Sequence, residues 1–201
     1  MSLITGLDEP FDLLLKLIRE GNRINMQSDN DDLIDHLFNF SVTAHSLRDW
    51  SIKYLNVTDP KEKDKLHEEW NKMACLVAAK NIANSSKHFG IKPKDSKVTG
   101  VLTSTREVVE LFGLIDSVDI MSGIEDGNGI TEPSIKNIPN FLITFTSFPD
   151  LDLWDYVLET IYFWAQFFDQ HDIPRDKRYG VNLLCWKRYH WPRVIADMDP
   201  N

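Results

Sequence analysis

The sequence predicts an α+β fold in which helices come first, a small antiparallel sheet follows, and a long aromatic helix comes next. Up to residue 92 the apolar residues recur at helical spacing, whereas from 96 to 148 short β-branched and aromatic runs are separated by turn residues. Residues 151–171 then combine acids in a first turn, a dense apolar pattern and a proline stop. Residues 172–201 have no clear period, and we expect an irregular tail with room for one short strand.

Composition indicates an ordinary globular protein. The 201 residues are 42% hydrophobic and 26% charged, so we expect one α+β domain over residues 1–201. Cys75 and Cys185 show neither a disulfide nor a metal-ligand spacing, and no apolar run approaches the roughly 18 residues that span a bilayer. No signal peptide is evident either. We therefore expect a cytoplasmic protein with no cofactor, no metal site and no contact with a membrane.

The first two helices are predicted from their apolar spacing. Acids and a proline precede the first, over residues 8–25. The second, over residues 31–55, carries two apolar stripes. One stripe is formed by Leu33, Leu37, Phe40, Ala44 and Leu47, and the other by Ile34, Phe38, Val42 and Ile52. Two stripes predict a central helix that is covered on two sides.

A third, continuous helix is expected after the charged turn at Pro60, ending at Gly90. Its apolar stripe continues into polar residues that we expect to face the core or a cleft. The stripe is Leu66, Trp70, Met73 and Val77, followed by Asn81, Asn84 and His88. If this helix forms an antiparallel hairpin with the second helix, residue 45 lies opposite about residue 74. Buried amides and imidazoles then need partners, because an unsatisfied group costs about 1–3 kcal/mol.

The region 96–148 predicts the sheet, with a turn at Glu125–Gly129. One segment leaves an alternative open. The stretch Ser104–Glu107 has a capping-box pattern and could start a short helix through Phe112.

Two polar clusters are candidate sites. In the first, "NIANSSKHFG" at 81–90, we assign Asn84, Lys87 and His88 to catalysis and Ser86 to binding. In the second, His45 and Asp49 lie one turn apart as a candidate binding pair, since a carboxylate there can fix the tautomer of the imidazole and raise its pKa. A structural role, in which His45 and Asp49 satisfy each other or neighbouring helices, is the more ordinary interpretation. The hairpin geometry separates His45 and Asn84 axially by ~15 Å, so we expect no direct contact unless the third helix kinks. The expected partners of Asn84 and His88 are then Asp35, His36 and Asn39, or residues from the C-terminal half.

The tail carries a local excess of positive charge on a chain of net charge −9. From Pro174 to Arg193 six cations face a single acid and alternate with aromatic residues. Cations and aromatic rings are the components of a single-strand nucleic-acid surface, to which we would assign Trp186 and Arg188. The interpretation that we favour is that this segment wraps onto the acidic body.

The stretches "FNFSVTAHSLRDW" and "NIANSSKHFG" resemble the two signature stretches of a group of uncharacterised bacterial and phage proteins, with T-A-x-x-L-x-D-W and A-N-x-S-K-H-F helices. The helical part of that group is loosely similar to the HEPN four-helix fold, whose RNases use an R-x(4 to 6)-H motif. This chain departs from the motif, because no arginine lies four to six residues before His88.

The resemblance implies an HEPN-like bundle in an interaction or regulatory protein of the mobile-element or phage-defence sphere. We expect this protein to have a protein partner or to associate with itself. An RNase or nucleotide-binding enzyme that uses Asn84 and His88 is the alternative.

Overall fold

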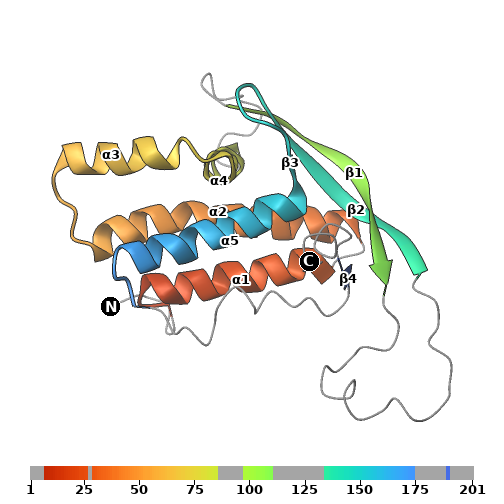
Figure 1. The fold of residues 1–201 in the computed structure, drawn as a ribbon, viewed down its shortest axis with the longest axis horizontal. Coiled ribbons are helices and arrows are strands. Elements are labelled where there is room, and N and C mark those ends of the chain that lie inside the picture. Colours follow the sequence, from red (N-terminus) through yellow and green to blue (C-terminus); the bar gives the residue numbers. More distant parts are fainter. Residues whose placement is uncertain (1–6, 27–28, 86–96, 111–133, 175–188, 191–201) are drawn as a thin grey trace, which may run out of the picture.

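The computed structural model describes residues 7–26, 29–85, 97–110, 134–174 and 189–190. It confirms the predicted α+β class, with helices and a small antiparallel sheet (Figure 1). In chain order the elements are α1 (Pro10–Met26), α2 (Asn30–Tyr54), α3 (Pro60–Trp70), α4 (Ala74–Ser85), β1 (Val98–Glu110), β2 (Ser134–Phe145), β3 (Leu151–Asp152), α5 (Leu153–Gln170) and β4 (Tyr189–His190). The two first helices, the sheet region and the aromatic helix all lie where the sequence predicts them.

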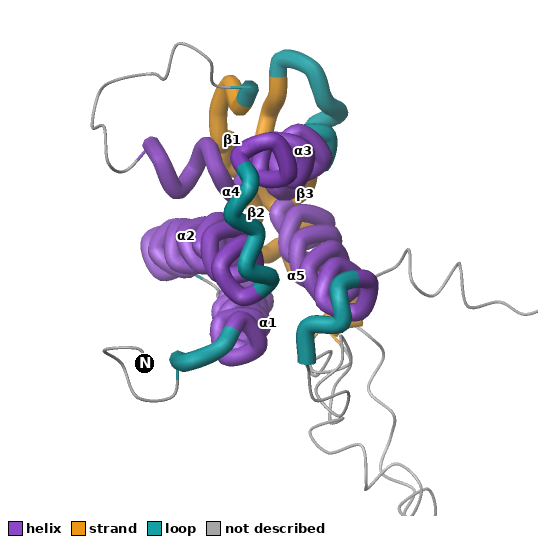
Figure 2. The backbone as a smooth tube through the Cα atoms, turned by 90° about the vertical axis from the view of Figure 1, so that its left-hand side faces the viewer, coloured by secondary structure: helices purple, strands orange, loops and turns teal. Residues whose placement is uncertain are grey.

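Helices α1, α2 and α5 surround a common centre, as Figure 2 shows from the end of the bundle. Helices α3 and α4 lie beyond them, and the sheet crosses one end of the bundle (Figures 1 and 2). Three of the described helices have an aspartate as N-cap residue. Asp29 accepts hydrogen bonds from the first backbone amides of α2, Asp59 precedes the proline that opens α3, and Asp152 accepts from Trp154 N in α5.

The predicted third helix is two helices, so that expectation is wrong. Helix α3 ends at Trp70, and Asn71 caps it before α4 begins at Ala74. The break has a packing reason. Trp70 is buried against Trp164 and Phe167 of α5, with ring centroids 5.7 Å apart in both pairs, while α4 buries its own face on α2. Since Figure 1 views α4 almost along its axis while α3 runs across the picture, one straight helix would not make both contacts.

Further predictions differ from the structure. Helix α4 crosses α2 instead of running along it, so the antiparallel hairpin is wrong (Figure 1). The first stripe of α2 is buried as predicted, but the second is half-buried, and Ile34 is 47% exposed. Met73, which was expected to face the core, lies in the break and is 39% exposed. Among the described residues, helix α2 is therefore buried along one broad side and partly exposed on the other.

The sheet has the strand order β3-β2-β1-β4. Strand β1 pairs with β2 along its length, with an irregularity between Val98 and Gly100. Strand β3 covers only Leu142 and Ile143 of β2. Ser104–Glu107 belong to β1, so the short-helix alternative is not adopted there. The predicted turn at 125–129 and the tail, apart from β4, lie outside the described residues.

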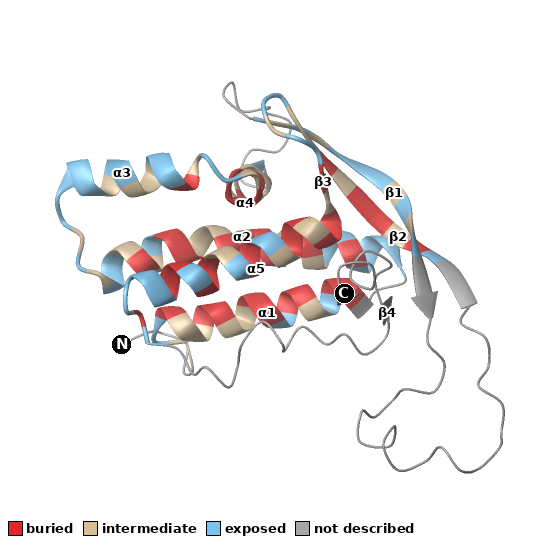
Figure 3. Ribbon diagram, viewed as in Figure 1, coloured by how far each residue is buried: buried red, intermediate tan, exposed pale blue. Residues whose placement is uncertain are grey.

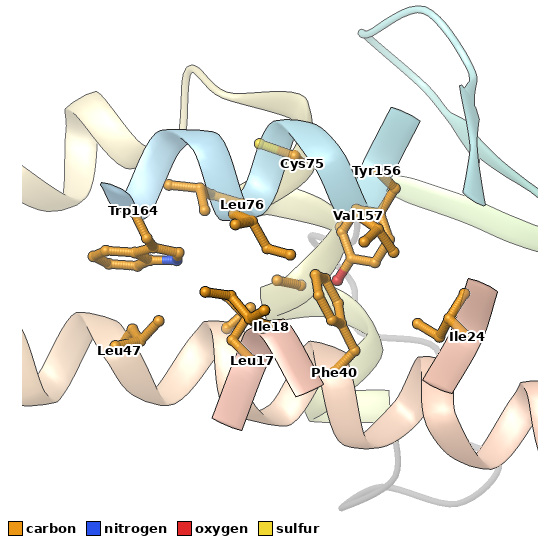
Figure 4. Packing of buried hydrophobic residues seen from close by; sticks show 14 of the residues in the cluster. Leu17, Ile18, Ile24, Phe40, Leu47, Cys75, Leu76, Tyr156, Val157 and Trp164 are labelled. Carbon is orange, nitrogen blue, oxygen red and sulfur yellow. The ribbon is translucent and has the colours of Figure 1, made fainter. Parts of the chain in front are cut away.

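The core joins the bundle to the sheet. Figure 4 shows side chains from four helices meeting at its centre, among them Leu17, Phe40, Leu76 and Trp164. Phe141 and Ile143 extend this core into β2. Among the described helices, none has the length and apolar character to cross a bilayer.

Candidate functional site

The structure describes three of the eight predicted site residues. These are Asn84, His45 and Asp49; Ser86, Lys87, His88, Trp186 and Arg188 lie outside the described residues.

Asn84 lies in the last turn of α4 and is half-buried. The buried face of that helix is formed by small and apolar residues and reaches Ala83, so Asn84 lies at its border. Asn81 finds its hydrogen-bond partner within its own helix: its side-chain amide donates to Val77 O at 2.8 Å. Asn81 and Asn84 therefore lie beside the core and do not continue into it, while the predicted cleft with His88 stays a prediction because that residue lies outside the described part of the chain.

His45 and Asp49 lie on α2, where His45 is half-buried and Asp49 is exposed. Burial lowers the pKa of Arg48 and of His67, and the charge of the Asp49 carboxylate partly offsets that effect on both groups. The cluster that Asp49 borders is thus centred on Arg48.

A cationic cluster lies where α2, α3 and α4 meet, and we call Arg48, His67, Trp70 and Lys80 the Arg48 junction. Arg48 is only 3% exposed. Its Nη2 donates to Leu76 O in α4 at 3.2 Å, and its guanidinium carbon lies 5.5 Å from the ring centroid of Trp70. The ring of His67 meets the same tryptophan edge-on, with centroids 5.4 Å apart. Arg48 thus connects α2 to both helices that follow it.

Burial and like charges set the protonation of the Arg48 junction. Burial lowers the pKa of Arg48 to about 10, so its guanidinium stays charged at neutral pH. Burial lowers the pKa of His67 below its usual value, and the charges of Arg48 and Lys80 add to that effect. The pKa of Lys80 is lowered by burial first and then by Arg48 and Lys97. At pH 7 the junction therefore combines cations with a neutral imidazole.

A second largely buried arginine has a different environment, which we call the hairpin anchor: Arg106, Asn140, Asp152 and Trp154. Nη1 of Arg106 lies 3.5 Å from Asp152 Oδ1, and Asn140 donates to Asp152 Oδ2 at 2.6 Å. Asp152 also caps α5 by accepting from Trp154 N at 2.8 Å. Ile24, Asn25 and Leu33 close the small pocket beside these groups. The hairpin anchor thus fixes the β1–β2 hairpin to the bundle.

Among the described residues, the outer edge of β1 is largely uncovered. Strand β4 pairs only with Val109 and Glu110, so among the described residues no strand lies beside Val98–Val108 on that side. Val101 is 38% exposed and Leu102 is 54% exposed, whereas Phe141 and Ile143 in β2 are buried (Figure 3). Apolar side chains of β1 are therefore exposed to solvent, whereas those of β2 belong to the core.

Comparison with known proteins gives no match for this chain among protein-family models, curated proteins or solved structures. Within the described residues no three histidine, cysteine, aspartate or glutamate side chains are grouped so as to hold a metal ion.

Sequence reasoning missed Arg48 although a signal was present. Arg48 follows Ala44 by one helical turn, so it lies on the apolar stripe of α2 that was predicted to be buried. A charge on a buried stripe is rarely tolerated without a partner. A charged residue on a stripe predicted to be buried was therefore the sequence signal that could have identified Arg48.

Proposed function

We propose that this protein is an interaction protein that associates with a second copy of itself along the outer edge of β1. The observation that supports the proposal is the edge from Val98 to Val108, which no strand covers among the described residues. The resemblance seen in the sequence favours a role in the mobile-element or phage-defence sphere, and that part of the proposal rests on the sequence alone.

The run Val98–Thr105 of this edge lacks the charged residues and prolines that often prevent strand addition. Exposed edge strands carry unpaired N–H and C=O groups, and proteins commonly guard them with lysines, prolines or short length. Strand β1 is 13 residues long, and the run Val98–Thr105 contains no charged residue and no proline. Val101 and Leu102 add exposed apolar surface at the middle of this run. An extended strand is the occupant that such an edge accepts.

A second copy fits this edge for two reasons. Two β1 strands in antiparallel pairing across a two-fold axis satisfy both free edges at once, because each copy offers the same donors and acceptors. The run Val98–Thr105 is also uncharged, so its pairing with itself sets no like charges opposite one another, although the whole chain has a net charge of −9.

Sedimentation velocity over a range of concentrations tests the proposal on the intact chain. We expect the wild type to form dimers as concentration rises. Leu102→Lys should abolish them, because it brings two ammonium groups close to the two-fold axis. Ile34→Lys is the matched control, since Ile34 is 47% exposed on α2, and it should leave association unchanged. A wild type that stays monomeric, or dimers that survive Leu102→Lys, would overturn the proposal. So would a loss of dimers in both variants.

A further inference from the structure

The small cavity beside the hairpin anchor lies where the last turn of α1 meets the β1–β2 hairpin. Its walls come from α1, α2, both strands of the hairpin and the first residues of α5. The space inside accommodates about one water molecule. For a cavity of this size, the chemistry of the walls decides whether water enters.

Polar side chains form part of these walls although they are largely buried. Asn25 is 6% exposed, Asn140 and Trp154 are each 5% exposed, and the side chain of Arg106 is 17% exposed. Cavities that stay dry are lined by apolar side chains, whereas a cavity with several hydrogen-bonding groups holds water. Here the guanidinium and the indole N–H are donors, and the two amides offer both donors and acceptors.

Charges of both signs at the cavity favour a neutral occupant. Arg106 is part of the wall, and Asp152 lies 3.5 Å from its Nη1 and accepts from the side-chain nitrogen of Asn140 at 2.6 Å. A cation in the cavity would face the guanidinium, and an anion would lie near the carboxylate. Either ion would also lose its hydration on entering. Because Asn140 binds Asp152 through its nitrogen, its amide oxygen can accept a hydrogen bond from an occupant.

We propose that this cavity binds one ordered water molecule, which donates to the amide oxygens of Asn25 and Asn140 and accepts from Arg106 or Trp154. Water is a neutral molecule of the right size that both donates and accepts, and a buried water typically makes about three hydrogen bonds. This water connects the last turn of α1 to the hairpin, so it extends the hairpin anchor to the first helix. The site is separate from the outer edge of β1, and its test does not depend on association.

Water-selective NMR on the intact, isotopically labelled protein tests the proposal, with the methyl protons of Leu33 and Leu153 as reporters. Both residues line the cavity and are only 1% and 3% exposed, so bulk solvent does not reach them. Methyl protons do not exchange with water, so magnetisation transfer to them requires a water molecule held beside them. We expect cross-peaks from water to both residues, of opposite sign in the laboratory-frame and rotating-frame experiments, as a long-lived bound water gives.

Asn25→Leu should abolish these cross-peaks, because it removes a polar partner and puts an apolar side chain into the cavity. Asn39→Leu is the matched control, since it is the same substitution at an exposed position of α2, and it should retain them. Cross-peaks that are missing in the wild type would overturn the proposal by themselves, so the test does not depend on the folding of either variant. Cross-peaks that survive in a folded Asn25→Leu protein, or that disappear in Asn39→Leu, would overturn it as well.

Discussion

The helical bundle and strand β1 differ in how they pair the N–H and C=O groups of their backbones. A helix pairs its interior N–H and C=O groups within itself, so α1, α2 and α5 need only bury their apolar stripes against one another. A strand needs neighbours on both sides, and among the described residues β1 has β2 on one side but only two residues of β4 on the other. The bundle therefore pairs its backbone within its own helices, whereas β1 has a described partner on one side only over most of its length. This contrast is why we locate the interaction in the sheet.

The largest effect should come from the centre of the bundle. Trp164 is fully buried and packs against Trp70 and Phe167, with centroids 5.7 and 5.5 Å from its ring. Trp164→Ala should lower the free energy of unfolding by about 3–5 kcal/mol, because it removes apolar contacts and leaves a cavity. Urea denaturation measures this loss. Tyr162→Ala, at a 55% exposed position of the same helix, should change stability by less than about 0.5 kcal/mol. Similar losses in both variants would contradict the burial pattern.

A smaller effect is expected where the sheet joins the bundle. Asp152→Ala removes the partner of Arg106, the acceptor of Asn140 and the cap of α5. We expect a loss of about 2–3 kcal/mol, since several contacts disappear together and the pair is partly exposed. Asp150→Ala is the control, because Asp150 is exposed and accepts from Phe145 N at 3.2 Å; it should cost less than about 1 kcal/mol. If urea denaturation gives equal losses, the hairpin anchor does not fix the sheet.

Acidification should reveal the charge of the Arg48 junction. The pKa of His67 is lower in the folded protein than in the unfolded chain, so His67 contributes stability above its usual pKa of 6.5, and this contribution is lost as pH falls through the lowered value. Between pH 7 and 5 the wild type should therefore lose more stability than His67→Gln, by less than about 1 kcal/mol because the ring is only half-buried. Thermal unfolding of both proteins over this range measures the difference. If the stability of the two proteins changes in parallel with pH, the pKa of His67 is not lowered by burial and by the charges of Arg48 and Lys80.

The smallest effect on the single chain should be at the edge itself. Leu102 is 54% exposed, so Leu102→Ser should change the unfolding free energy by less than about 0.5 kcal/mol when measured under dilute conditions. The same substitution should weaken association, because Leu102 lies at the middle of the proposed contact. A large loss of stability at low concentration would instead assign Leu102 to the core of the chain.

Local signals predicted most of the fold. Caps, prolines and apolar spacing placed α1, α2 and α5 closely, because such signals act within a few residues. The break at Asn71 was missed because it depends on the distant contacts of Trp70 with α5. The second stripe of α2 was expected to be covered because it is apolar, but apolar spacing does not show whether another element packs on it, and it is half-buried.

The candidate site was less predictable than the fold. The sequence pointed to polar residues at the end of α4, whereas the structure draws attention to Arg48, whose significance depends on which side chains surround it. Lys87 and His88 lie outside the described residues, so the alternative of an RNA-cleaving or nucleotide-binding enzyme stays a prediction.

Hydrogen–deuterium exchange of the intact protein at low and high concentration tests the interaction most directly, because it reads the backbone amides of β1 themselves. We predict that amides in Val98–Thr105 gain protection as concentration rises, while those of α5 exchange at the same rate under both conditions. Leu102→Lys should abolish the gain. Exchange in Val98–Thr105 that is unchanged with concentration, or protection gained on the helices instead, would contradict the account.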